Sequence, residues 1–519
     1  MQLFEMLFII ITVVALLQIN SPKLFPVSLR VIIMLAISFG LLHLVFEGPR
    51  WQVLPAYIVF ALVCLFCLKK SQSHFVWRVF GLSLGILFVS FSILLVLLFP
   101  VIALPPPTGP YLVGNFSTVL IDETRAERYE PEFNRGVPIQ VWYPSSSQEP
   151  DDYARQSLFS QLYAGEYDLI SFLTGYLQNI KTHSYINAPI ADAETYPIII
   201  FNHGLFMTGD QNPQLMEHLA SHGYVIVSVS HPFESAKVLL PDRGVRTYSM
   251  RYPEDVGFNA NEVNDGGIGD TIGTVTGLEH SKLMTTLYEQ LDRYRDASAE
   301  EKIAVVRDAV ENEALGPLGR ALNEANLTSF FEIRDKVRNR STQYWVEDIS
   351  FVIEQLRYLD APVSNFSASI DPSQVGALGH SYGGSAVGEF CKTDIRCAAA
   401  SNLDGTQFGS NWNKPVQAPF LLINTDANAR GNDYAYYPVQ NDFFDLHIPD
   451  TEHGDLIDAL TAFPIWKISG LGGEMGVQEL ADIVKDLELA FFDEYLKGKE
   501  GSFEMALKRN SERLVIFDH

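Results

Sequence analysis

The residues best suited to chemistry lie in the run Gly379-His380-Ser381-Tyr382-Gly383-Gly384, which directly follows the apolar segment Val375 to Leu378. Glycines two positions before and two positions after a serine allow a sharp turn between a strand and a helix. Such a turn lifts the serine hydroxyl above the sheet, where a substrate carbonyl can reach it. We therefore interpret Ser381 as a nucleophile.

A second match to the same motif, Gly81-Leu82-Ser83-Leu84-Gly85, has a different setting. It lies within a long apolar segment, and no strand precedes it. We interpret these as small residues in a membrane helix. The surrounding sequence, rather than the motif, separates the two serines.

A serine hydroxyl needs a histidine to accept its proton and an acid to orient that histidine. In hydrolases with this serine turn, the acid and then the histidine follow the nucleophile along the chain. His453 fits the base, because it lies in the polar loop Pro449 to Asp455 after the last predicted strand. His447 lies within that strand, and we interpret it as structural.

Two aspartates are candidates for the acid. Asp404 follows the strand Ala398 to Leu403, and Asp426 follows the strand Pro419 to Asn424. Spacing alone slightly favours Asp426, because most enzymes of this fold take the acid from the later strand. Either carboxylate can instead cap a turn.

The oxyanion of a tetrahedral intermediate needs backbone N–H donors that already point at it. The loop Asn202 to Phe206 follows a buried strand and contains Gly204. We assign the donors as the amides of Leu205 and Tyr382, the latter at a helix N-terminus. His203 is expected to pack near this loop rather than to react.

The sequence gives little reason to expect a metal or a cofactor. His218 and His222 have a spacing that suits metal binding, but the glutamate of H-E-x-x-H is absent, and we interpret both as solvated helix residues. The glycine-rich run Gly266 to Gly269 follows no strand, so we interpret it as a loop rather than a phosphate site.

The elements that must position these residues alternate between strands and helices beyond Pro105. Continuous apolar strands alternating with helices predict a parallel sheet covered on both faces, here an α/β-hydrolase fold over residues 105–519. Residues 233–344 interrupt the alternation and are predicted to form a helical cap. The predicted segments are strands Thr118 to Asp122, Val137 to Tyr143, Pro197 to Phe201, Tyr224 to Val229, Val375 to Leu378, Ala398 to Leu403, Pro419 to Asn424 and Phe443 to Ile448, and helices Pro213 to Ser221, Trp345 to Leu359, Gly383 to Cys391 and Val477 to Lys497.

Residues 1–104 contain four apolar stretches, each near the length that crosses hydrocarbon. We predict four transmembrane helices. Basic residues are concentrated in the first and third connections, which places both in the cytoplasm and the hydrolase part on the extracytoplasmic side. The four stretches are Met6 to Ile19, Leu24 to Phe46, Trp51 to Leu68 and Phe80 to Leu104, and the basic residues are Lys23, Arg30, Lys69, Lys70 and Arg78 against Arg50.

Charge and cysteine content restrict the partners and the compartment. The first 104 residues hold six of the 37 Lys and Arg and two of the 62 Asp and Glu, so the remainder has a formal net charge of −29. This acidity argues against nucleic acid as a partner. Cys391 and Cys397 are close enough in sequence to form a disulfide, and two buried thiols are the alternative.

From about Pro107 to Lys497, the chain resembles the platelet-activating-factor acetylhydrolase family and the dienelactone-hydrolase-like esterases grouped with it. The resemblance implies Asp404 as the acid, supports His453, and implies ester hydrolysis without calcium on lipids with short or oxidised acyl chains. The N-terminal helices and the insertion near residues 234–343 have no counterpart in that family. Its motifs are Gly109-Pro110-Tyr111-Leu112-Val113-Gly114, Val141-Trp142-Tyr143-Pro144, Phe201-Asn202-His203-Gly204-Leu205, Ala220-Ser221-His222-Gly223-Tyr224, Gly379-His380-Ser381-Tyr382-Gly383-Gly384 and Asn402-Leu403-Asp404-Gly405.

The sequence thus predicts a membrane-anchored serine esterase that acts on lipid or phospholipid esters through Ser381, His453 and Asp404. One alternative is a dienelactone- or polyester-type hydrolase, or an amidase, with the same triad. Another is a non-catalytic membrane scaffold whose hydrolase domain is vestigial. Acyl-chain profiling separates the enzymes from one another, and loss of catalysis on removal of Ser381 separates them from the scaffold.

Overall fold

The computed structural model describes most of the chain, including all of the residues assigned to the candidate site. The described residues are 2–21, 24–69, 75–146, 152–165, 168–192, 195–249, 338–411, 414–426, 436, 441–468, 470 and 472–517, without the side chains of 68, 69, 75–78 and 468. Most of the predicted cap, residues 250–337, and the Gly266 to Gly269 loop therefore lie outside the described residues.

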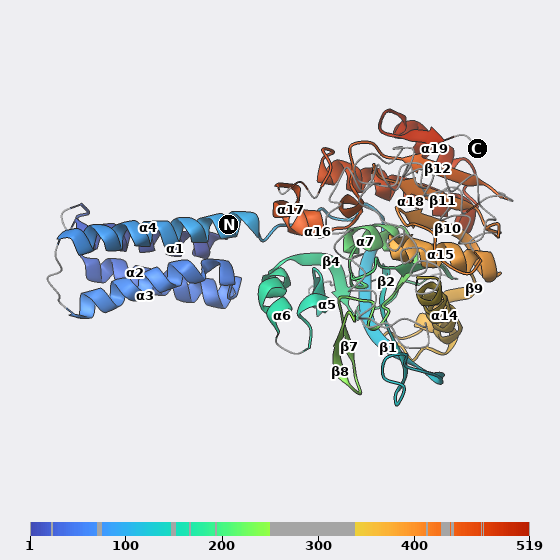
Figure 1. Cartoon of the computed structure of the whole chain (residues 1–519), viewed down its shortest axis with the longest axis horizontal. Helices are drawn as coiled ribbons and strands as arrows, with labels where there is room; N and C mark the ends of the chain where they lie inside the picture. Colours follow the sequence, from blue (N-terminus) through green and yellow to red (C-terminus); the bar gives the residue numbers. More distant parts are fainter. Residues whose placement is uncertain are drawn as a thin grey trace, which may run out of the picture.

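The part that follows the N-terminal apolar helices is built on a mixed, mostly parallel sheet (Figure 1). Among the described residues the strand order is β13-β12-β11-β10-β9-β5-β6-β2-β1-β4-β3. The six strands from β12 to β6 run parallel to their neighbours, whereas β2, β1, β13 and β3 introduce antiparallel pairs. The strands are β1 Leu112–Ala126, β2 Asn134–Ser145, β3 Arg155–Ser157, β4 Lys181–Ile186, β5 Tyr196–Asn202, β6 Val225–Val229, β9 Ile370–His380, β10 Cys397–Leu403, β11 Phe420–Asn424, β12 Phe443–His447 and β13 Val515–Phe517.

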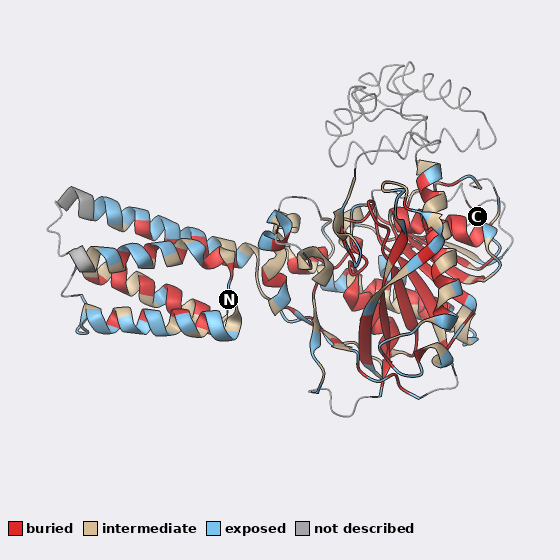
Figure 2. Ribbon diagram, turned by 90° about the horizontal axis from the view of Figure 1, so that it is seen from below, coloured by how far each residue is buried: buried red, intermediate tan, exposed pale blue. Residues whose placement is uncertain are grey.

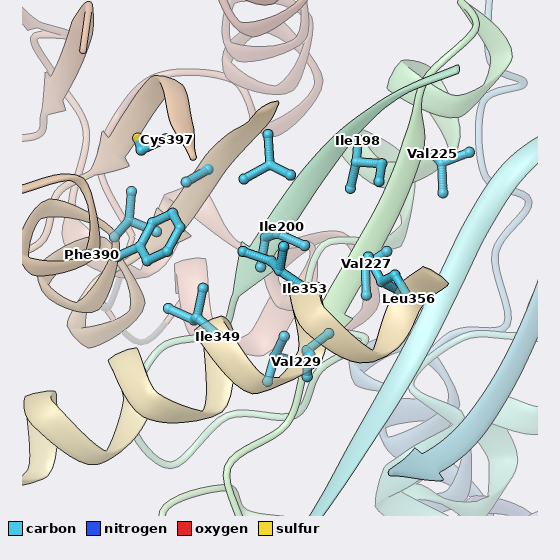
Figure 3. Packing of buried hydrophobic residues seen from close by; sticks show 14 of the residues in the cluster. Ile198, Ile200, Val225, Val227, Val229, Ile349, Ile353, Leu356, Phe390 and Cys397 are labelled. Atoms are coloured by element: carbon cyan, nitrogen blue, oxygen red, sulfur yellow. The ribbon is translucent and has the colours of Figure 1, made fainter. Parts of the chain in front are cut away.

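Both faces of the parallel strands are buried because their apolar residues are continuous rather than alternating. In β5, Ile198 and Ile200 face one hydrophobic cluster, while Ile199 and Phe201 face the other. Figure 3 shows the first cluster, in which β-branched side chains of β5 and β6 pack against residues such as Ile353. Figure 2 shows the same sheet as the most buried layer of the molecule.

Helices cover the two faces in separate sets. α14 (Asn339–Gln355) and α15 (Tyr382–Thr393) pack on the first face, and α7 (Pro213–Ser221), α18 (Val477–Lys497) and α19 (Ser502–Arg509) on the second. The predicted bounds of the helices at 213 and 477 agree with α7 and α18. This arrangement confirms the predicted α/β-hydrolase-like architecture of a mostly parallel sheet covered by helices.

Where the sequence pattern loosens after His231, the described residues form a small separate hairpin. β7 (Lys237–Leu240) pairs antiparallel with β8 (Gly244–Thr247). Its strands are only four residues long, which is why alternation did not reveal them. The hairpin is the first part of the segment predicted as a cap.

All four N-terminal apolar stretches form helices, which lie side by side in a bundle (Figure 1). The bundle exposes many large apolar side chains, as expected for a surface that meets hydrocarbon. Figure 2 shows that much of the outer surface of its helices is exposed. Both the start of α1 and the end of α4 lie at the end nearest the sheet. The helices are α1 Leu3–Asn20, α2 Leu29–Leu42 continued by a π-helical turn His43–Glu47, α3 Leu54–Lys69 preceded by a 3₁₀ turn Trp51–Val53, and α4 Phe75–Leu98.

The prediction of four transmembrane helices is wrong in number. Three described segments, Leu3–Asn20, Leu29–Glu47 and Val79–Leu98, are long and apolar enough to cross a membrane. The remaining one, Trp51–Cys67, is apolar but shorter. At 1.5 Å per residue it reaches about 25 Å, less than the ~30 Å hydrocarbon layer.

Polar contacts of the loop between α2 and α3 hold the bundle together at its end nearest the sheet and connect it to the part that contains the sheet. Nη1 of Arg50 lies 2.5 Å from Oε2 of Glu5, and neither side chain is exposed. Nη2 of Arg50 donates to the carbonyl oxygen of Phe99 at 2.5 Å. The indole N–H of Trp51 donates to the carbonyl oxygen of Leu173, in α6 (Leu169–Thr174), at 2.9 Å. The loop between α2 and α3 thus ties α1, the end of α4 and α6 together.

The structure also distinguishes between the disulfide and the two buried thiols considered for Cys391 and Cys397. Cys391, at the end of α15, and Cys397, at the start of β10, form a disulfide across a six-residue separation. This bond fixes the connection between the helix that follows Ser381 and the strand that precedes Asp404.

Candidate active site

Ser381 occupies the turn between β9 and α15, at the centre of the sheet. Its backbone has φ 56° and ψ −123°, a conformation that non-glycine residues rarely adopt. The flanking glycines allow it, since a Cβ on Gly383 would lie 2.1 Å from the carbonyl oxygen of Asn202, and one on Gly379 would lie 2.2 Å from that of Gly383. The strained turn points the hydroxyl away from the sheet.

Three residues far apart in the sequence meet above the carboxyl ends of the strands. Nε2 of His453 lies 2.8 Å from Oγ of Ser381. Nδ1 of His453 lies 2.6 Å from Oδ2 of Asp404. His453 begins a 3₁₀ turn after β12, and Asp404 directly follows β10. Because the carboxylate accepts the proton on Nδ1, Nε2 is left to accept the proton of the serine.

The carboxylate of Asp404 is itself held in place. The Thr425 amide donates to Oδ1 and the Thr425 hydroxyl donates to Oδ2, both at 2.8 Å. Asp404 is 1% exposed, and its backbone φ is 57°. These contacts fix the direction in which the carboxylate faces His453.

The alternative acid, Asp426, forms a separate pair. Its Oδ1 lies 2.7 Å from Nε2 of His447, and its side chain is 45% exposed. Its Oδ2 accepts from the amide of Asp450 at 3.0 Å. The structure therefore brings Asp404, and not Asp426, to His453.

The electrostatic environment of His453 suits a base. Burial alone would lower its pKa, but the hydrogen bond and negative charge of Asp404, with the charge of Glu452, raise it above the ordinary histidine value. The side chain is 42% exposed, so a substrate can approach Nε2.

His380, next to the nucleophile, packs on His453. The two rings are 4.8 Å apart, and Nε2 of His380 donates to the carbonyl oxygen of His453 at 3.2 Å. Burial and the neighbouring His453 lower the pKa of His380 to about 3, so the ring stays neutral.

The predicted oxyanion loop passes directly beside Ser381. A Cβ on Gly204 would lie 3.3 Å from Cβ of Ser381. The amide of Gly204 donates to Oε1 of Gln211 at 2.8 Å, and the amide of Phe206 to the carbonyl oxygen of Glu234 at 2.9 Å. These contacts hold the loop on both sides of Leu205, whose amide is one of the two predicted donors.

His203 supports this loop from beneath and is fully buried. Its Nδ1 donates to the carbonyl oxygen of Gly204 at 2.7 Å, and its Nε2 accepts from the hydroxyl of Ser235 at 2.8 Å. Burial and the nearby His231 lower the pKa of His203 to about 3. A neutral ring is required for Nε2 to accept.

A buried network behind the loop was not foreseen from the sequence. His231 links Oδ1 of Asn202, at 3.1 Å, to Oδ2 of Asp348, at 2.9 Å, and stacks on Trp345. Nη2 of Arg135 donates to the same Oδ2 at 2.7 Å. His231 lies two residues after the end of β6, which was the available signal, but its partner Asp348 is more than a hundred residues away.

The histidine pair of α7 is not the solvated pair that was predicted, because His218 is 8% exposed. The rings of His218 and His222 are 4.5 Å apart. Among the described residues, no group of three or more His, Cys, Asp or Glu is arranged to hold a metal ion.

Comparison with known sequences identifies relatives of this chain. The family model of platelet-activating factor acetylhydrolase, isoform II, matches residues 98–242. The platelet-activating factor acetylhydrolase of Cavia porcellus is 24% identical over 426 residues, covering 80% of this chain and 82% of that protein. That of Canis lupus familiaris is 24% identical over 416 residues, covering 76% and 77% respectively.

A solved structure has the same fold. The ferulic acid esterase from Streptomyces cinnamoneus aligns with a TM-score of 0.52 at 17% identity, over 81% of this chain and all of that chain. The residues matched by the family model end before Ser381, so that match includes none of the three candidate side chains.

Proposed function

Because the chain is an α/β-hydrolase of the platelet-activating factor acetylhydrolase family, we propose that it is a serine esterase that cleaves lipid esters through an acyl-enzyme. The observation that carries the proposal is the pair of contacts at His453, 2.8 Å to Oγ of Ser381 and 2.6 Å to the carboxylate of Asp404. A serine nucleophile needs a base that accepts its proton and an acid that orients the base, and these two contacts supply both.

In the proposed mechanism, Ser381 attacks the ester carbonyl while Nε2 of His453 takes the hydroxyl proton. The amides of Leu205 and Tyr382 stabilise the oxyanion of the tetrahedral intermediate. His453 then gives the proton to the leaving alcohol, and an acyl-Ser381 ester remains. Water, activated by His453, releases the acid by the reverse sequence, while Asp404 holds the ring in its productive tautomer.

We assign lipid esters as the substrates because the hydrolase part is attached directly to the apolar bundle. α6 exposes Leu169 and Leu173, 70% and 41% respectively, and Leu173 accepts the hydrogen bond from Trp51 at the bundle end. An active site tethered beside a bilayer meets amphiphilic esters at a high local concentration.

The bundle serves as a membrane anchor in this proposal, with the hydrolase part on the extracytoplasmic side. The concentration of Lys and Arg in the first and third connections supports that orientation. The start of α1 and the end of α4 lie at the same end of the bundle, next to the hydrolase part (Figure 1). The Cys391–Cys397 disulfide also fits an oxidising compartment.

Hydrolysis by the full-length protein in phospholipid nanodiscs tests the function. We expect cleavage of phosphatidylcholines that carry a short sn-2 acyl chain, and a loss of about 10⁴-fold or more in Ser381→Ala and His453→Gln. His447→Gln is the matched control and should stay active, because His447 pairs with Asp426 instead. Cleavage of small soluble esters with lipids inert would remove the lipid assignment, and unchanged turnover in Ser381→Ala would remove the enzyme assignment.

Proteolysis of intact cells tests the orientation separately. Protease added outside should digest the hydrolase part while leaving the bundle. Protection of the hydrolase part until the cells are opened would reverse the assigned side.

A further inference from the structure

The bundle contains an apolar groove at a distance from the candidate active site. It has a volume of about 400 Å³ and lies between α3 and α4. Buried residues Leu16, Val59 and Val63 form its floor, and exposed residues Leu62 and Phe88 form its rim. Its lining is almost entirely apolar, and α1 closes it from behind.

The two glycines of the second G-x-S-x-G match create this groove. A Cβ on Gly85 would lie 2.6 Å from Cδ2 of Leu16, so glycine lets α4 lie close to the Leu16 side chain of α1. A Cβ on Gly81, one turn earlier, would meet no atom within 4 Å. The missing side chain at Gly81 therefore leaves a space that the described side chains do not fill.

The groove continues into a more polar hollow at the end of the bundle remote from the sheet. The two share Ile19 and Phe66, and the hollow has a volume of about 940 Å³. The connection before α2 lines it, together with Arg30. Arg30 is exposed, and among the described acidic side chains none forms an ion pair with it.

We propose that the groove and the hollow together bind one anionic phospholipid, with an acyl chain along Gly81 and the phosphate at Arg30. This inference rests on the proposed membrane anchoring. A groove that faces hydrocarbon is filled by a lipid chain rather than by water, and its volume lies in the range of sites for hydrophobic small molecules. The charge of Arg30 favours an anionic headgroup over a zwitterionic one.

The position of the site agrees with this ligand. In the sequence, Lys23 precedes α2 and Lys70 follows α3, so both are close along the chain to residues that line the hollow. In the proposed orientation the end of the bundle with the hollow faces the cytoplasmic leaflet, where anionic lipids are concentrated. The lipid would therefore bind in the leaflet opposite the hydrolase part, and it is distinct from the substrate.

Native mass spectrometry of the full-length protein tests the proposal, with phosphatidylglycerol and phosphatidylcholine of identical chains as probes. We expect one phosphatidylglycerol to be retained, about fivefold more strongly than phosphatidylcholine. Arg30→Gln should abolish that preference. Gly81→Leu should fill the groove and weaken retention of both lipids by about tenfold or more. Ser83→Leu is the matched control, because Ser83 is exposed on the same helix outside the groove.

Turnover of a soluble ester by each variant serves as the measure of folding. Ester turnover by the variants should equal that of the unaltered protein, since the groove is remote from Ser381. Absence of turnover in the unaltered protein and in all variants would count against the proposed function rather than against the lipid site. If Gly81→Leu does not fold, Leu62→Trp fills the same groove from α3. Equal retention of the two lipids by the unaltered protein, or undiminished retention in both groove-filling variants, would overturn the proposal.

Discussion

Replacement of Asp404 by asparagine should remove most of the activity while leaving the fold in place. The amide of Thr425 can only donate, so the side-chain oxygen of the asparagine must take the place of Oδ1. Its NH₂ group then occupies the place of Oδ2 and faces Nδ1 of His453, which lies 2.6 Å away in the unaltered protein. Nδ1 must accept that hydrogen bond, and the imidazole proton moves to Nε2.

A proton on Nε2 prevents His453 from taking the proton of Ser381, which lies 2.8 Å away. Selection of the wrong tautomer in a serine triad costs about 10⁴-fold in kcat, equivalent to about 5.5 kcal/mol in the activation barrier. The assay is the steady-state hydrolysis of a chromogenic short-chain ester, with circular dichroism to confirm folding.

Asp426→Asn provides the matched control for this change, because it alters the other aspartate–histidine pair of the same sheet edge. We expect its kcat to remain within about tenfold of the unaltered protein. A larger loss in Asp426→Asn than in Asp404→Asn, or a loss below tenfold in folded Asp404→Asn, would refute the reasoning.

Three further predictions follow from the same contacts. The value of kcat/KM should fall as pH decreases, because protonated His453 cannot accept a proton. The midpoint should lie above the ordinary histidine pKa of about 6.5, since the effect of the Asp404 carboxylate on the pKa outweighs that of burial. A midpoint well below 6 would contradict the predicted upward shift. Replacing Cys391 and Cys397 by serine should lower the free energy of unfolding by about 2 kcal/mol, as expected for a short closed loop, and an unchanged thermal melting curve would argue against the bond. Gly383→Ala should abolish turnover, because the added Cβ would lie 2.1 Å from the carbonyl oxygen of Asn202 at the end of β5. Gly175→Ala is the control and should be tolerated in the same assay, because a Cβ at that position would meet no atom within 4 Å.

The parts of the fold that the sequence predicted are those set by local pattern. The apolar runs of β5, β10 and β11 are continuous because both faces of each strand are buried, so they stand out against polar connections. The bounds of α7 and α18 were predicted because a Pro at the start of the first and a Gly after the end of the second mark their limits. Short elements such as β13 carry no such periodic signal.

The candidate site was predictable only where its residues follow strands. Ser381 and His453 were assigned from their position after apolar runs. Spacing alone slightly favoured Asp426 over Asp404, which is wrong, and only the family resemblance pointed to Asp404. The structure separates them through the contacts of Thr425 and of His447, which depend on how neighbouring strands are aligned.

Contacts that span the chain were not accessible to sequence reasoning. The pair of Arg50 and Glu5 joins the loop before α3 to α1, although the two residues are 45 positions apart in the sequence. The third apolar stretch was predicted as one spanning helix because its apolar composition begins at Trp51, whereas Trp51–Val53 form a 3₁₀ turn and the α-helix begins only at Leu54.

The acyl-enzyme chemistry of Ser381 is tested most directly by reaction of the full-length protein with a fluorophosphonate, followed by peptide mass spectrometry. We predict one phosphonate adduct per chain on the peptide that contains Ser381, and none in Ser381→Ala. An adduct on a different residue, or no adduct in protein that still hydrolyses esters, would contradict the assignment.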